Sequence, residues 1–149
     1  MTIAPYRSVV VEEWLWSTVG AIPSVVSIFG DNIVANHIEE ESGTPTPFLE
    51  ILRHPGSNNV RPMVSTGGII AETFTFDISG WAEAFSTESI RSAMEDIDTA
   101  LIDADDPLQD GYLIVVDDNG ELPPAPAPRP GERPTVRLGK QYTLSALGG

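Results

Sequence analysis

The chain has 149 residues, no cysteine, and 8 lysines and arginines against 22 acidic residues, which gives a formal net charge of -14. Without cysteine, disulfides, thiolate zinc sites and cysteine nucleophiles are excluded, and so acidic a chain gains nothing from neutralising phosphates, which disfavours a DNA-gripping role. The length fits one domain, and neither a signal peptide nor a bilayer-spanning run is visible, so we expect a soluble protein in the cytosol.

A helix is predicted from Ser8 to Ile22. Its apolar residues recur at helical spacing: Val11, Trp14, Leu15 and Val19. Ser8 is the candidate N-cap, and the β-branched residues after it are mediocre helix formers. Trp14 and Trp16 lie two positions apart and cannot face the same core, so one tryptophan is a candidate for a subunit interface.

Pro23 should interrupt this helix, and residues 24–29 predict a short second helical turn that ends at Gly30. A short strand is predicted from Ile33 to Ile38. After an acidic loop, Phe48 to Arg53 predicts a further strand. Both faces of that strand are partly apolar, which indicates an interior position in the sheet.

The residues from His54 to Gly68 show no periodicity and are rich in proline, glycine and asparagine. A connection this long is uncommon inside a compact domain, and such loops are generally functional or disordered. Arg61 and Met63, a cation and a pliable apolar side chain, suit a docking surface. A flexible tip without a role is an alternative of equal weight.

The clearest pattern of the chain runs from Ile69 to Leu101. Alternate residues of its strand are apolar, which gives the strand one buried face: Ile70, Phe74, Phe76 and Ile78. Ser86 is then the predicted N-cap of a helix, and Glu88 lies in the first turn, where the helix dipole favours an acid. The apolar residues of the helix follow at intervals of four, three and four: Ile90, Met94, Ile97 and Leu101. A strand that delivers such a helix onto its own sheet predicts an α+β fold.

Acidic residues after this helix invite a calcium interpretation: Asp103, Asp105, Asp106 and Asp110. Their spacing fails the EF-hand template, because Pro107 stands where a third ligand should be and no glycine follows at the required place. A solvated loop is therefore predicted. Tyr112 to Val116 predicts a strand that is buried on both sides, and Asp118 to Gly120 predicts a turn.

Prolines alternate with alanine and arginine from Leu122 to Pro134, which excludes a helix or an interior strand and predicts an extended surface segment. A plain spacer between two strands is the favoured interpretation. The alternative is docking to a partner through Pro124, Pro126 and Pro128. Regular alternation from Thr135 to Leu147 predicts a last strand, which should pair with the strand that begins at Ile69.

The residues offer no catalytic motif. His37 and His54 lie on different predicted elements, and no HExxH, GxSxG, Walker loop or GxGxxG occurs. Lys140, the single lysine, lies within a predicted strand and is a poor Schiff-base candidate. We therefore expect no catalytic, cofactor-binding or metal-binding residues, no cofactor, and a protein that is not an enzyme.

The order of elements and four short motifs resemble the tail-terminator family of long-tailed bacteriophages, also called minor tail or tail-completion proteins. The motifs are GDNIV, TPTPFLEI, ETFTFDISGWA and RLGKQYTLSAL. In that family a glycine and an aspartate precede the first strand, as Gly30 and Asp31 do here. Thr46 to Ile51 matches its next strand, and Thr75 to Ala82 matches its long strand that ends in tryptophan plus a small residue. The resemblance runs from about Val11 to Leu147.

Two segments are longer than is usual in the family: residues 122–134 and residues 54–68. The resemblance suggests the hypothesis that both are virus-specific contacts with neighbouring ring subunits or neck proteins. The whole chain, residues 1–149, is expected to form a single tail-terminator-like domain. We expect a mainly antiparallel sheet of about four to five strands with two main helices packed on it.

The resemblance implies a structural virion protein that forms a homo-hexameric ring, caps the tail tube, ends tube polymerisation and joins the tail to the head-neck complex. Implied partners are further copies of the chain, the major tail tube protein and a head-closure or connector neck protein. The implied location is the tail-neck junction of the virion, after assembly in the host cytoplasm and without a membrane.

The genome would pass through such a ring without specific binding, which an acidic surface favours by repulsion, although solubility alone also explains the charge. Ring closure is a heterologous contact, for which Trp16, Arg61 and Met63 are the candidates. Two alternatives remain open from the sequence. One is another head-tail connector or head-closure protein, and the other is a non-viral cytosolic protein-binding module whose proline-rich segment docks a partner.

Overall fold

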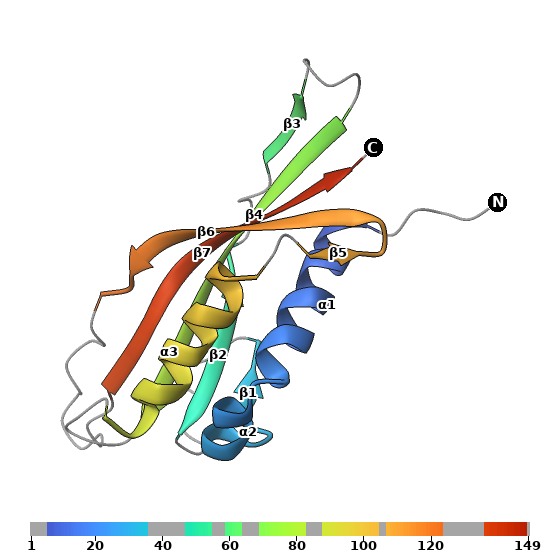
Figure 1. The fold of residues 1–149 in the computed structure, drawn as a ribbon. Helices are drawn as coiled ribbons and strands as arrows, with labels where there is room; N and C mark the ends of the chain where they lie inside the picture. The colour runs from blue at the N-terminus through green and yellow to red at the C-terminus, as the bar shows by residue number, and fades with distance from the viewer. Residues whose placement is uncertain are drawn as a thin grey trace.

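In the computed structural model, helices lie on one side of a long, curved β-sheet (Figure 1). The structure describes residues 6–35, 47–54, 59–63, 69–82, 88–104, 107–123 and 136–148. The strands are β1 (Ile33–Val34), β2 (Phe48–Arg53), β3 (Asn59–Met63), β4 (Ile69–Ala82), β5 (Leu108–Gln109), β6 (Tyr112–Glu121) and β7 (Val136–Gly148). Their order across the sheet is β1-β2-β4-β7-β6-β5, and β3 pairs with β4 beside this path.

Strand β4 organises the sheet from its centre. One of its edges pairs with β7, from Ile70 opposite Gly148 to Ala82 opposite Val136. Its other edge carries two strands in succession, β3 opposite residues 69–73 and β2 opposite residues 76–81. The predicted pairing of the two long alternating strands is thus confirmed. The predicted interior position of β2 is also confirmed, because β2 lies between β1 and β4.

The helices are α1 (Arg7–Gly20), α2 (Pro23–Phe29) and α3 (Glu88–Ile102). Pro23 occupies the first turn of α2, where its missing N–H leaves no hydrogen bond unmade. The helix ends at Gly30, whose φ of 57° is one that glycine adopts freely. Tyr6 precedes α1 without a side-chain cap, so the prediction that Ser8 is the N-cap is wrong.

The core lies between the helices and the sheet. Successive residues of a strand point to opposite faces, and the even-numbered residues of β4 and β7 face the helices. All four apolar residues predicted for the buried side of α3 are buried: Ile90, Met94, Ile97 and Leu101. At Gly80 a side chain would meet the Met94 sulfur and the Phe29 ring. The absence of a side chain at Gly80 therefore lets the helices approach the sheet closely.

The α+β class is confirmed, but the prediction of four to five antiparallel strands is wrong. In its described part the sheet has seven strands, and β1 pairs with β2 in parallel. Strand β1 begins at Ile33, as predicted, but no residue pattern announces its parallel pairing with β2. Strand β5 has two residues, which is too few to produce a periodicity. Strand β3 lies inside the predicted loop 54–68, and Pro62 interrupts its pattern. An edge strand tolerates proline because one row of its N–H groups has no partner strand.

Strand β6 differs from its prediction in two ways. It extends to Glu121, so the predicted turn at Asp118 to Gly120 is wrong. It is also buried on one face rather than on two: Ile114 is fully buried, whereas Leu113 and Val115 are only partly buried. The reason is that the described helices cover only one side of the sheet. We call the other side the helix-free face.

Several predictions fall on residues outside the described ranges. They concern the strand beyond Ala35, the cap at Ser86, the acidic pair Asp105 and Asp106, and the proline-rich segment beyond Pro123. Within the described residues, no single helix has the length and apolar character to span a membrane. Helices α1 and α2 meet these criteria only as a joined pair, across a bend of 79°.

Candidate functional site

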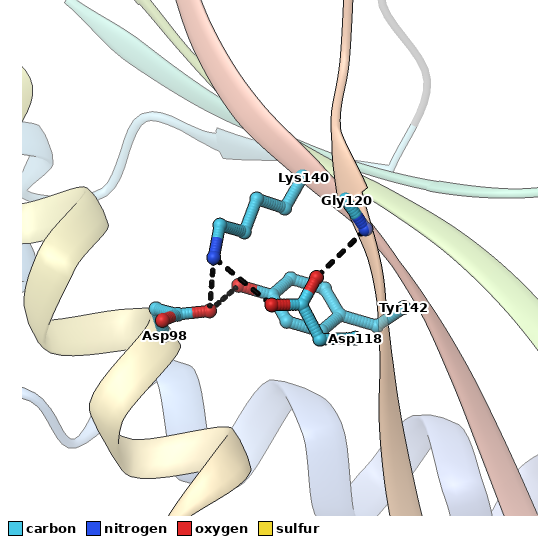
Figure 2. Close-up of polar contacts among 5 residues, drawn as sticks. All are labelled: Asp98, Asp118, Gly120, Lys140 and Tyr142. Atoms are coloured by element: carbon cyan, nitrogen blue, oxygen red, sulfur yellow. Dashed lines mark hydrogen bonds and ion pairs between the residues drawn. The ribbon is translucent and has the colours of Figure 1, made fainter.

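Lys140 on β7 joins three elements of the fold through two carboxylates (Figure 2). Its Nζ lies 3.2 Å from Asp98 Oδ1 on α3 and 3.0 Å from Asp118 Oδ2 on β6. The Tyr142 hydroxyl donates a hydrogen bond of 2.8 Å to the same Asp98 oxygen. Lys140 and Tyr142 are even-numbered residues of β7, so both side chains lie on the helix side. This polar cluster therefore ties the middle of α3 to the sheet.

Asp118 lies next to a β-bulge of β6. The register of β6 shifts between Asp118, opposite Tyr142, and Glu121, opposite Lys140. Asp118 Oδ1 accepts a hydrogen bond of 2.7 Å from the Gly120 N–H. Gly120 has a φ of 101°, which costs glycine little. The Asp-Asn-Gly sequence that predicts a turn therefore forms a bulge within a strand.

The contacts in the polar cluster shift three pKa values. The Gly120 N–H, and next the Lys140 ammonium, lower the pKa of Asp118 from its ordinary value of 3.8. The hydrogen bond to Asp118 is the largest influence that raises the pKa of Lys140 from 10.5. Burial, and then the bond to Asp98, raise the pKa of Tyr142. All three groups keep their ordinary charge at neutral pH, so none of the three is poised for acid-base catalysis.

A cavity of about 480 Å³ lies beside the polar cluster, between α3 and strands β6 and β7. Its lining combines charged and apolar side chains: Arg91, Met94, Glu95, Asp98, Glu121, Leu138, Lys140 and Tyr142. Arg91 pairs with Glu88 at 3.4 Å and with Glu95 at 3.5 Å, so both cations of the lining are already paired with carboxylates. Among the residues that the structure describes, no three His, Asp or Glu side chains are placed to hold a metal.

The helix-free face carries a chain of polar contacts across β4, β7 and β6. Asp77 pairs with His54 Nε2 at 2.8 Å and accepts a hydrogen bond of 3.1 Å from Gln141 Nε2. Asn119 Nδ2 donates to Gln141 Oε1 at 3.3 Å and to Thr143 Oγ1 at 2.7 Å. Amide and hydroxyl groups thus dominate the middle of this face.

An aromatic stack lies at one end of the same face. The rings of Phe48 and Trp81 lie 9° from parallel, with centroids 5.9 Å apart. The Arg137 guanidinium lies 5.3 Å from the Trp81 ring centroid and donates a hydrogen bond to the Pro123 carbonyl oxygen. Stacking and cation-π attraction therefore hold together the ends of β2, β4 and β7.

The predicted contact residues fall at separate places. Trp16 on α1 is partly buried and packs against the core, while Trp14 is buried within it. Arg61 and Met63 lie on β3, opposite Ala71 and Ile69 of β4. Trp16 therefore lies on a helix, whereas Arg61 and Met63 lie on a strand that pairs with β4. Pro124, Pro126 and Pro128 lie outside the described residues.

Exposed apolar side chains mark surfaces that the sequence did not reveal. Within the described part of the chain the large ones are Tyr6, Val9, Val26, Ile102 and Leu108. Val9 and Val26 lie in helices whose apolar residues are mostly buried, so composition alone does not distinguish them. Leu108 lies in a strand of two residues, which leaves no pattern to interpret.

Comparison with solved structures identifies a chain with the same arrangement of elements. It belongs to the virion of a native gene transfer agent particle, with a TM-score of 0.63 and 13% sequence identity. The alignment covers 97% of this chain and 100% of the other. A scan against models of protein families and a search of curated proteins give no match. This chain therefore has the fold of a protein found in a gene transfer agent virion.

Proposed function

We propose that the chain is a structural protein of a phage-like virion, and that it acts as a tail terminator. In this role six copies form a ring on the end of the tail tube. The ring stops the addition of tube subunits and offers its other face to a head-closure or connector protein of the neck. The chain performs no chemical reaction in this role.

The observation that carries this proposal is the fold shared with a virion chain over nearly the whole length of both proteins. Because nearly all of both chains is matched, the similarity concerns the complete fold and not one segment of it. The resemblance of the four sequence motifs to tail terminators supports the same role. Two of these motifs form the central strands β4 and β7.

The placement of the cations adds support. Each of the five whose side chains the structure describes is engaged inside the chain. Arg53 pairs with Glu12 at 3.0 Å, and Arg91 and Lys140 pair with carboxylates as above. Arg7 and Arg137 lie over aromatic rings. A surface whose cations are already engaged attracts a passing genome weakly, because DNA affinity depends on cations that reach the phosphates.

The proposal is tested by mixing the purified chain with tubes of the major tail protein from the same particle and, separately, with tailless heads. Electron microscopy should show a ring at the tube ends, and tubes already capped should not lengthen when more tube protein is added. Tubes that grow past their natural length without a ring at their tips would refute the proposal. Rings on the heads alone would instead establish a connector or head-closure role.

A further inference from the structure

Three exposed apolar side chains surround the β5 edge of the sheet. Tyr6 and Val9 lie three positions apart at the start of α1 and are 82% and 42% exposed. Leu108 on β5 is 74% exposed. The start of α1 lies against this edge, because the Arg7 guanidinium is 5.1 Å from the Tyr112 ring centroid and Tyr112 pairs with Gln109 of β5. We call Tyr6, Arg7, Val9 and Leu108 the β5 patch.

Arg7 gives the β5 patch a positive charge that no described carboxylate neutralises. Its Nη2 donates a hydrogen bond of 2.9 Å to the Gly148 carbonyl oxygen, and its Nε is buried without a hydrogen-bond partner. By contrast, Arg53, Arg91 and Lys140 each pair with a carboxylate of the same chain. In a chain of net charge -14, a cation left beside apolar side chains suits a partner that brings a carboxylate and an apolar group together.

The opposite end of the sheet offers that combination. Val26 on α2 is 55% exposed, and Asp31 is exposed between α2 and the edge strand β1. We call Val26 and Asp31 the β1 patch. Strands β1 and β5 end the sheet order, five strand spacings or roughly 24 Å apart. Figure 1 shows α2 and β1 at one end of the molecule, away from β5 and the start of α1.

We propose that the β5 patch of one copy contacts the β1 patch of the next copy, with Arg7 facing Asp31 and the apolar side chains of the two patches packed together. The inference rests on the proposed ring and names the contact that closes it. Patches at opposite ends of a subunit cannot meet within one copy. They can meet between copies placed head to tail, which is the heterologous geometry that a ring requires.

Cross-linking tests this contact cleanly, because the chain has no natural cysteine. The double variant Leu108→Cys with Val26→Cys is treated with a short bismaleimide at moderate salt, over a range of protein concentrations. A ladder of covalent multimers is expected, because each copy can link to a neighbour on either side. Each single variant should stay monomeric on the gel. The matched control, Leu108→Cys with Asp117→Cys, places its second thiol on an exposed residue of β6 outside both patches and should give no ladder.

The outcomes separate this inference from the proposed function. Multimers in sedimentation without a ladder would overturn the contact and leave the ring standing. Monomers in sedimentation without a ladder, with and without tubes, would overturn both. A ladder from a chain that fails to cap tubes would support the contact and refute the terminator role.

Charge reversal tests the polar part of the contact. Asp31→Arg should weaken self-association about tenfold, since it sets two cations against each other. Adding Arg7→Glu to the same chain should restore most of the affinity, because every contact then regains one charge of each sign. Unchanged association of Asp31→Arg, in a variant whose circular dichroism and melting temperature match the parent, would overturn the assigned pair.

Discussion

Three glycines in different surroundings give a graded test of the packing, and the tightest of them lies where β4 and β7 approach each other. At Gly139 on β7, an added Cβ would contact the Ile78 carbonyl oxygen and lie 2.8 Å from Ser79 Cα. Both atoms belong to the backbone of the central strand, so neither can rotate away. Overpacking of this kind costs about 1–3 kcal/mol. We expect Gly139→Ala to lose about 3 kcal/mol, at the upper end of that range.

Two further substitutions of the same kind serve as controls. At Gly80 the nearest atom to an added Cβ is the Met94 sulfur at 2.8 Å, which belongs to a flexible side chain, so Gly80→Ala should lose about 1 kcal/mol. At Gly20 no atom lies within 4 Å of an added Cβ. Gly20→Ala should therefore lose nothing and gains helix propensity at the end of α1.

Urea denaturation measures this series, because the midpoint falls in proportion to the lost free energy when the m-value is unchanged. For a chain of this length, a loss of about 3 kcal/mol corresponds to a fall in melting temperature of about 6–12 °C. If Gly139→Ala unfolded at the midpoint of Gly20→Ala, the backbone contact between β4 and β7 would be refuted.

The remaining predictions concern the polar cluster. Lys140→Met should lose about 1 kcal/mol in urea denaturation at low salt, because the partly exposed carboxylates of Asp98 and Asp118 lose their shared cation, and the loss should shrink at high salt. The pKa of Asp118 is lowered in the folded chain, so the stability that its charge contributes is present above pH 3.8 and is lost as the pH falls below it; a constant difference between the parent and Asp118→Asn down to pH 2 would contradict this. The pKa of Tyr142 is raised, so the ultraviolet titrations of the parent and Tyr142→Phe should show the same phenolate signal through pH 10. An additional phenolate signal in the parent below pH 10 would show that the Tyr142 hydroxyl is exposed to water and would contradict its burial.

Strong periodicity explains which elements the sequence predicts correctly. The alternation of β4 and β7 and the spacing of Ile90 to Leu101 on α3 each repeat several times, so one face of each element is unambiguous. Their burial follows from that face alone. Strand β1 begins at Ile33, as predicted, whereas β3 and β5 escape prediction because their pairing with longer neighbours, rather than their own residues, makes them strands.

The candidate site could not be predicted because its parts come from distant positions. Lys140 meets Asp98 and Asp118, which lie 42 and 22 positions away in the sequence. No local motif links them, and the Asp-Asn-Gly sequence at Asp118 predicts a turn rather than a strand. As a lone lysine within a predicted strand, Lys140 indicates no contact with either carboxylate. Its position on the helix side of β7 follows from the alternation of that strand, which is the one signal that pointed toward α3.

The engagement of cations within the chain has a consequence for the timing of assembly. Arg53, Arg91 and Lys140 are bound to carboxylates of their own chain. They are therefore not available to attract the carboxylates of another copy, and free copies, each with a net charge of -14, repel one another. Dilute salt lengthens the range of this repulsion, so light scattering should show that closed rings become rarer as ionic strength falls. We expect spontaneous closure in solution to be slow. A template that holds several copies side by side would overcome the penalty and confine closure to the place where it is needed.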